Sequence, residues 1–210
     1  MALQPLQLIK ITIATSLVAM LSACSTGAPA IKTDTNTTAV ISNNPIATEQ
    51  VVVLDPKIEH EFNLGIKAMA EKNYNKAEDI FLKMTQAYPS LSGPFANLGT
   101  VLTAKKDYPN AELAFKHALR LNPENAEAFN HLGLLHRQTG RFQEALQTYK
   151  QGLMVAPKNT NLLRNIGILY ELYLSSPNAA LEYYQRYLEE KPEDKQVQLW
   201  ASLLNRQSGS

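Results

Sequence analysis

Glycine returns at a fixed interval through most of this chain, and that interval constrains the fold more than any other feature. Alanine, an aromatic residue and proline return with it, each at its own distance from the glycine. The four series keep a spacing of 34 positions, or 35 at the last step of the last three: Gly65, Gly99, Gly133, Gly167; Ala77, Ala111, Ala145, Ala180; Phe81, Phe115, Tyr149, Tyr184; Pro89, Pro123, Pro157, Pro192. Such a period is typical of stacked repeats, in which each unit buries its apolar face against the next.

Each repeat is expected to hold two helices joined by a short turn. Asp55 and Pro56 are a start signal, because Asp caps a helix and Pro suits the first helical position. Pro89 ends the second helix, since proline cannot continue one. A glycine on the first helix and an alanine on the second allow the two backbones to approach to about 8–10 Å. The aromatic side chain is expected to fill the gap between one repeat and the next.

One more helix is expected after the last repeat, from about residue 194 to 205. Val197, Trp200, Leu203 and Leu204 are expected to lie on its buried face. Its outer side would carry the polar residues Lys195, Gln198 and Arg206. A repeat array needs such a terminal element, because its last unit otherwise exposes an apolar side. Trp200 is therefore interpreted as a core residue of this cap.

The repeat pattern resembles the tetratricopeptide repeat. A bulky residue stands four positions before the glycine at Phe95, Phe129 and Leu163, although Glu61 breaks this rule in the first repeat. The resemblance implies an all-α fold, a right-handed α-solenoid of four helix pairs followed by a capping helix. The expected boundaries are 58–91, 92–125, 126–159 and 160–193 for the repeats, and 194–210 for the capping helix and tail.

The amino-terminal residues are expected to lie outside this fold. Residues 1–23 combine one basic side chain, a short apolar run and small residues, which is the pattern of a secretory signal. The sequence Leu21-Ser22-Ala23-Cys24 resembles the bacterial lipobox, which implies cleavage before Cys24 and lipid on that cysteine. Residues 24–57 are then the lipidated cysteine and a flexible tether, because the segment is rich in small polar residues and lacks a helical apolar period.

The lipobox resemblance also implies a location in the cell. Ser25, rather than Asp, follows the cysteine, and in enteric-type bacteria this implies sorting to the outer membrane. We therefore expect a lipid-anchored protein of the bacterial outer membrane that faces the periplasm. A plain signal peptide beside a chance cysteine is the alternative interpretation.

The composition and the motifs argue against several classes of function. The formal net charge is only +1, and no basic face suggests nucleic acid. Cys24 is the only cysteine, and the four histidines have no metal-ligand spacing. The sequence contains no glycine-rich phosphate loop and no nucleophile elbow. We expect no enzyme activity, no cofactor, no metal and no small-molecule substrate.

The expected binding surface is the concave groove that first helices line in arrays of this family. One residue per repeat, two positions before each glycine, is expected to point into it: Asn63, Asn97, His131 and Asn165. An amide side chain can donate to and accept from a peptide backbone at once. Arg137 and Arg164 are expected to add positive charge in the second half of the groove. The alternative is that all six are solvated side chains without a ligand.

These features predict an interaction scaffold that holds a segment of a partner protein in its groove. The most specific hypothesis is an assembly factor resembling the pilotin-like lipoproteins of type IV pilus systems, which help a secretin ring assemble. The alternative is an adaptor or regulatory subunit of a cell-envelope enzyme, such as a murein hydrolase, a protease or a polysaccharide export complex.

Overall fold

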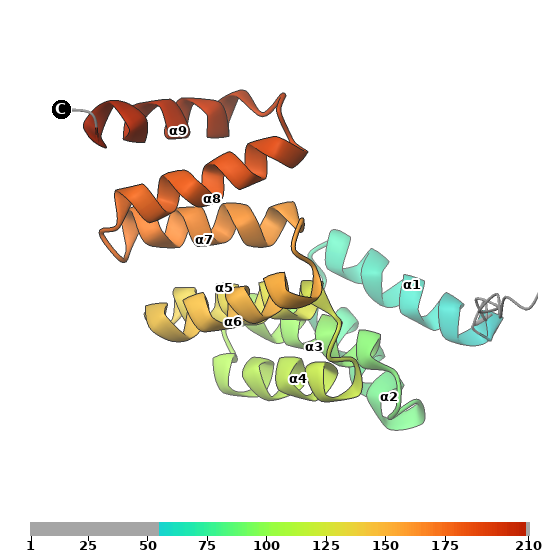
Figure 1. Ribbon diagram of the computed structural model, residues 1–210. Helices are drawn as coiled ribbons and strands as arrows, with labels where there is room; N and C mark the ends of the chain where they lie inside the picture. The colour runs from blue at the N-terminus through green and yellow to red at the C-terminus, as the bar shows by residue number, and fades with distance from the viewer. Residues whose placement is uncertain (1–54, 209–210) are drawn as a thin grey trace, which may run out of the picture. The chain divides into compact units, whose positions relative to one another are not determined.

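The computed structural model describes residues 55–208, and every regular element in that range is an α-helix. The signal peptide, Cys24 and nearly all of the tether lie outside the described residues. The helices succeed one another as follows (Figure 1): α1 (Pro56–Ala70), α2 (Tyr74–Ala87), α3 (Ser92–Ala104), α4 (Tyr108–Leu121), α5 (Ala126–Gln138), α6 (Phe142–Val155), α7 (Thr160–Leu172), α8 (Pro177–Glu190) and α9 (Lys195–Ser208).

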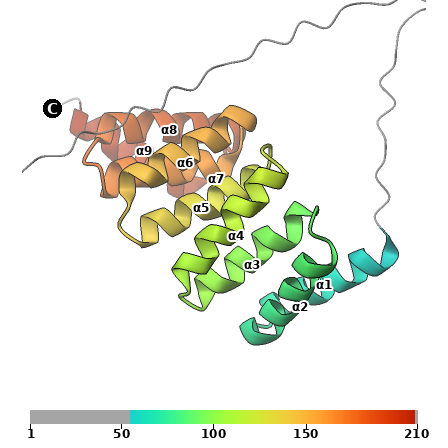
Figure 2. The same cartoon turned by 90° about the horizontal axis from the view of Figure 1, so that it is seen from below.

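The helices pack in sequence order, each against the one before it and the one after it (Figure 2). The odd-numbered helices α1, α3, α5 and α7 also contact one another, whereas the even-numbered ones do not. One side of the array is therefore formed by first helices, and the opposite side by second helices. The all-α solenoid of four helix pairs with a final helix, expected from the sequence, is confirmed.

Short polar side chains set most of the helix starts. Asp55 accepts a hydrogen bond from the backbone N–H of Lys57 at 2.8 Å, and Asn125 accepts one from Ala128 at 2.9 Å. Asn73, Asp107 and Asn159 cap their helices in the same way. The turn inside each repeat contains one residue with positive φ, at Lys72, Lys106, Gly140 and Ser175. These positions keep the repeat spacing, with the extra residue of the fourth repeat in the turn after α7.

The aromatic residue of each repeat explains why the repeat needs a glycine. A Cβ added at Gly65 would lie 2.5 Å from the ring of Phe81, and one at Gly99 would lie 2.8 Å from the ring of Phe115. Gly133 and Gly167 stand in the same relation to Tyr149 and Tyr184. The ring of the second helix thus covers the glycine of its own repeat. The rings also contact the following unit, as Phe115 does with His131 and Tyr184 with Trp200, so each aromatic residue packs both within its repeat and against the next one.

Helix α9 covers the last helix pair, α7 and α8, with a narrower buried face than the sequence predicted. Val197, Ala201 and Leu204 are buried, whereas Leu203 is 42% exposed. The reason is geometric, since positions i, i+4 and i+7 share one helix face and position i+6 lies off it. Trp200 is half-buried against Tyr184, with ring centroids 5.6 Å apart, in agreement with a core role. None of the helices in residues 55–208 has the length and apolarity that crossing a membrane requires.

Candidate functional site

The first helices form a groove of about 540 Å³, which we call the inner groove. It lies between α3, α5 and the end of α7. Its walls are Thr100, Thr103, Ala104, Lys106, Phe115, His131, Leu134, Arg137, Gln138 and Tyr173. Of the six residues expected to bind a partner, the inner groove brings two together, His131 and Arg137.

His131 is held in place by an aromatic contact and a carboxylate. Its ring lies parallel to that of Phe115, with centroids 6.1 Å apart. Its Nε2 atom is 3.7 Å from the Glu127 carboxylate one helical turn earlier. Burial lowers the pKa of His131 below 6.5, and the Glu127 charge opposes this shift only in part. At neutral pH the ring is therefore uncharged and offers the groove one hydrogen-bond donor and one acceptor.

Arg137 supplies positive charge on the same helix. Its guanidinium lies over the ring of Tyr173, 6.0 Å from the centroid. No carboxylate within residues 55–208 forms a salt bridge with it. Beside it, the Gln138 side chain donates a hydrogen bond to the Tyr108 hydroxyl at 3.0 Å. The inner groove therefore presents an unpaired cation next to a half-exposed aromatic ring.

The other expected binding residues do not join this site. Asn63 is exposed on α1, and the Asn97 amide donates to the Gly93 carbonyl of its own helix at 3.1 Å. Asn165 is only 7% exposed, and its amide donates to Asn130 Oδ1 at 2.8 Å. Arg164 does not line the groove; the pKa of Asp194 is lowered chiefly by the hydrogen bond from the Tyr187 hydroxyl, with a smaller contribution from the Arg164 charge. The four residues before the glycines thus occupy different environments rather than one continuous row.

Sequence reasoning did not single out Asn130 or Tyr173. Asn130 lies on α5 at the position where the flanking repeats carry Ala96 and Arg164, so no recurring residue type marks it. Its spacing of 35 from Asn165 was the available signal, because that spacing places the two side chains on neighbouring first helices. Tyr173 follows the last residue of α7, where the extra residue of the fourth repeat disturbs the register.

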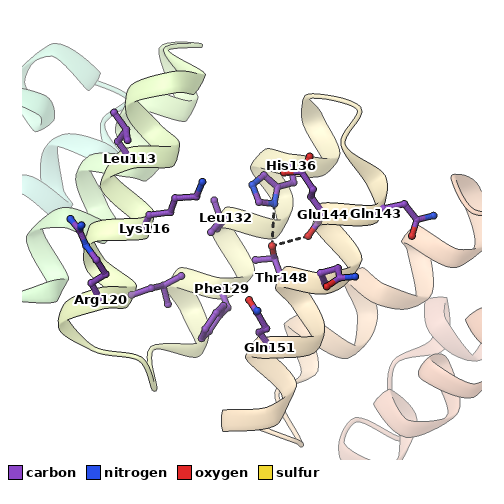
Figure 3. Close-up of a pocket in the computed structure, with 12 residues that line it drawn as sticks. Leu113, Lys116, Arg120, Phe129, Leu132, His136, Gln143, Glu144, Thr148 and Gln151 are labelled. Carbon is purple, nitrogen blue, oxygen red and sulfur yellow. Dashed lines mark hydrogen bonds between the residues drawn. The ribbon is translucent and has the colours of Figure 1, made fainter. Parts of the chain in front are cut away.

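A larger groove of about 800 Å³ lies on the other side of the array, and we call it the outer groove (Figure 3). It runs between α4, α5 and α6 and contains none of the residues expected to bind a partner. Its lining residues are Leu113, Lys116, Leu119, Arg120, Phe129, Leu132, His136, Gln143, Glu144, Gln147, Thr148 and Gln151.

A buried histidine forms the floor of the outer groove. His136 is 5% exposed, and Thr148 lies 3.1 Å from its Nδ1 atom. The Thr148 hydroxyl already donates to the Glu144 carbonyl at 2.8 Å, so the His136 Nδ1–H must be the donor to Thr148 (Figure 3). Leu102 and Ala114 occupy the corresponding positions one repeat earlier. The polar pair of the third repeat therefore has no counterpart in the second.

An ion-pair network surrounds this histidine. The Glu112 carboxylate accepts from Arg141 at 2.6 Å and from Lys116 at 2.7 Å, which lowers its pKa to about 2. Burial lowers the pKa of His136, and the Arg141 charge lowers it further. The Nε2 atom of His136 stays 3.6 Å from Glu112 and has no hydrogen-bond partner in the described part of the chain. Residues 55–208 contain no group of His, Cys, Asp and Glu that would hold a metal ion.

Comparison with known proteins agrees with the repeat architecture. The model of the tetratricopeptide-repeat family described as cilia and flagella-associated protein 70 C-terminal domain matches residues 61–208. The chain belongs to this family. No curated protein matches the sequence.

Several solved structures have the same fold as this chain. The pilF protein of Pseudomonas aeruginosa is 22% identical with a TM-score of 0.66, over 72% of this chain and 68% of its own. TTC0263, a tetratricopeptide-repeat protein of Thermus thermophilus, is 21% identical with a TM-score of 0.63, over 70% and 80%. YrrB, described as having an unusual peptide-binding site, is 25% identical with a TM-score of 0.57, over 69% and 74%.

Proposed function

We propose that this chain is a scaffold that binds a segment of a partner protein in its inner groove. The observation that carries the proposal is the groove itself, where the unpaired Arg137 lies beside Tyr173. Thr100, Thr103 and Gln138 line the same walls and keep side-chain oxygens that can accept hydrogen bonds, although each already donates one within the protein. Leu134 adds an apolar surface. A groove with a cation, an aromatic ring and several hydrogen-bonding side chains suits an extended or helical protein segment.

The absence of other chemistry within residues 55–208 supports a binding role over catalysis. Neither groove contains a nucleophile hydrogen-bonded to a general base in the way that covalent catalysis requires. YrrB, one of the proteins with the same fold, is described by its peptide-binding site. We therefore favour an interaction protein over an enzyme.

We further propose that lipid on Cys24 holds the scaffold at the bacterial outer membrane, facing the periplasm. The proposal rests on the lipobox-like sequence Leu21-Ser22-Ala23-Cys24 and on Ser25. The chain carries too little net charge for electrostatic attraction to anionic lipids, so the acyl chains must supply the attachment. Residues 25–54 would then separate the folded array from the membrane surface.

The favoured pathway is type IV pilus or secretin biogenesis, because the pilF protein of Pseudomonas aeruginosa shares the fold. The alternative is an adaptor or regulatory subunit of a cell-envelope enzyme. Deletion of the gene distinguishes them. The pilus role predicts loss of secretin multimers and of surface fibres, whereas the adaptor role predicts normal fibres and an altered turnover of the enzyme's substrate.

Affinity purification from native membranes tests the scaffold role itself. We expect partner proteins to co-purify with the tagged full chain and to be lost with the double variant His131→Ala and Arg137→Ala. The matched control is Gln147→Ala with Gln151→Ala in the outer groove, which should leave the partners in place. If the inner-groove variant retained its partners and the outer-groove variant lost them, the inner groove would not be the binding surface.

A further inference from the structure

Two tyrosines at the same position of successive repeats meet different surroundings. In the fourth repeat the Tyr184 hydroxyl donates a hydrogen bond to the Glu171 carboxylate at 2.7 Å. The glycine of each repeat lies against the tyrosine ring, so both rings have the same orientation relative to the first helix. The fourth repeat therefore shows what this position accommodates: a carboxylate next to a tyrosine hydroxyl.

The third repeat has no carboxylate at the position that Glu171 holds in the fourth repeat. Arg137 stands 34 positions before Glu171, and Tyr149 stands 35 positions before Tyr184. Tyr149 is fully buried, and its hydroxyl has no hydrogen-bond partner among the described residues. Arg137 is close enough for its charge to oppose the rise in the Tyr149 pKa that burial causes. The Tyr149 hydroxyl is thus a buried donor without an acceptor, which is costly, and Arg137 is a cation without a carboxylate among the described residues.

The charges of the inner groove point to the same missing group. Lys106 and Arg137 line it, and the lining contains no Asp or Glu. The Glu127 carboxylate of the same helix pairs with His131 and not with Arg137. A partner side chain with negative charge would pair with Arg137 in a partly desolvated site, where a charge-assisted hydrogen bond is at its strongest.

We propose that the inner groove binds an acidic side chain, Asp or Glu, of the partner segment. Arg137, which lines the groove without a carboxylate partner, is its counter-ion. The incoming carboxylate supplies the negative charge that Glu171 carries at the corresponding position of the fourth repeat. This inference rests on the proposed function, because it specifies the chemistry of the segment that the scaffold holds. The arginine fork suits it, since its donors can bind a carboxylate while the guanidinium plane stays on Tyr173.

Peptide display on the purified full chain tests this inference. Random peptides displayed as internal segments, without a free carboxyl terminus, are selected against the wild type, Arg137→Glu and Arg120→Glu. Arg120 is the matched control, because it is an arginine of the outer groove. We expect an excess of Asp and Glu in the peptides selected by the wild type and by Arg120→Glu. We expect that excess to disappear with Arg137→Glu.

The outcomes separate this inference from the proposed function. Selected peptides without an acidic excess, or with an excess that survives Arg137→Glu, would overturn the inference and leave the scaffold role standing. A wild-type chain that selects no peptide at all would overturn both. Thermal unfolding of each variant shows whether it remains folded, and Arg137→Gln serves in place of Arg137→Glu if the latter unfolds.

Fluorescence anisotropy then measures the carboxylate directly. An enriched peptide with an amidated carboxyl terminus is compared with the same peptide carrying Gln in place of its acidic residue. We expect a loss of affinity of about tenfold or more, as for a hydrogen bond to a charged group. Arg137→Lys should retain part of the affinity, because it keeps the positive charge but loses the planar fork. Equal affinity for the two peptides, or binding only through a free carboxyl terminus, would overturn the proposal.

Discussion

At position 133 the ring of Tyr149 fills the space that any side chain would need. The glycine series is thus a packing requirement between the two helices of one repeat. The glycines have no binding or catalytic role of their own, although counting from them identifies the residues that line the inner groove. The same register shows where repeats differ, as at Arg137 and Glu171, and those differences are more informative about binding than the shared residues.

Replacement of Gly133 by Leu should therefore destabilise the protein. The added side chain overlaps with the Tyr149 ring, so either the ring leaves its site or the two helices separate. We expect a loss of about 1–3 kcal/mol of unfolding free energy, the usual effect of overpacking a core. Urea denaturation measures it, with Gly93→Ala as control because only the tip of Phe62 lies near that position, 3.2 Å away. An unshifted midpoint for Gly133→Leu would contradict the packing role.

His136 should make stability depend on pH. Burial lowers its pKa in the folded state below 6.5, so the unfolded chain binds a proton more readily than the folded one. Its contribution is therefore fully present above about pH 6.5 and is lost as the pH falls through the folded-state pKa. Glu112 has a pKa lowered to about 2 and acts in the same direction, but only below its ordinary value of 4.5.

The variant His136→Leu tests this assignment, because Leu102 occupies the corresponding position one repeat earlier. We expect its unfolding free energy to fall less than that of the wild type between pH 7 and pH 5, the range in which an ordinary histidine titrates. His131 also has a lowered pKa, so His131→Gln is the parallel comparison. Identical pH profiles of wild type and His136→Leu in urea denaturation would refute the role of His136.

At the scale of elements, α5 and α7 are joined by the buried hydrogen bond between Asn130 and Asn165. The sequence predicted the helices, their order and their turns, because caps, glycines and prolines act locally. It predicted the inner groove only in part, since His131 and Arg137 line it and Asn165 serves packing. Whether an amide faces a ligand or a neighbouring helix depends on the residue across the interface. No local pattern contains that residue.

Asn165→Ala should reduce stability because it leaves the Asn130 amide buried without its partner. We expect a loss of about 1–3 kcal/mol, the cost of an unsatisfied buried polar group. Asn63→Ala is the matched control, because Asn63 holds the same position in the first repeat and is exposed. Urea denaturation of the two variants side by side checks the prediction. Equal midpoints would mean that the Asn130–Asn165 contact contributes nothing.

At the scale of the whole molecule, an array of this kind has two surfaces that can bind a partner, one of first helices and one of second helices. The outer groove is larger, and its buried His136 donates to Thr148 within the protein, while the His136 Nε2 atom has no hydrogen-bond partner among residues 55–208. The inner groove is smaller but is lined by the unpaired Arg137, which lies over the Tyr173 ring. We therefore propose that the partner binds the inner surface.

The proposed anchor is tested by Cys24→Ala. Because Cys24 is the only cysteine, the variant removes the single site of thioether-linked lipid. We expect loss of fatty-acid labelling and a shift of the protein away from the membrane fraction, since the remaining chain has little electrostatic attraction to lipid. Ser25→Ala is the control and should keep the label. Unchanged labelling of Cys24→Ala would contradict the lipoprotein interpretation.

Photo-crosslinking in intact cells tests the central claim most directly. A photoreactive amino acid is placed at Thr103 in the inner groove or at Gln147 in the outer groove of the full chain, and the crosslinked proteins are identified by mass spectrometry. We predict that the same partner crosslinks at Thr103, that Arg137→Glu abolishes this product, and that Gln147 does not capture it. Capture of the partner at Gln147 alone, or an undiminished product at Thr103 with Arg137→Glu, would contradict the assignment of the inner groove.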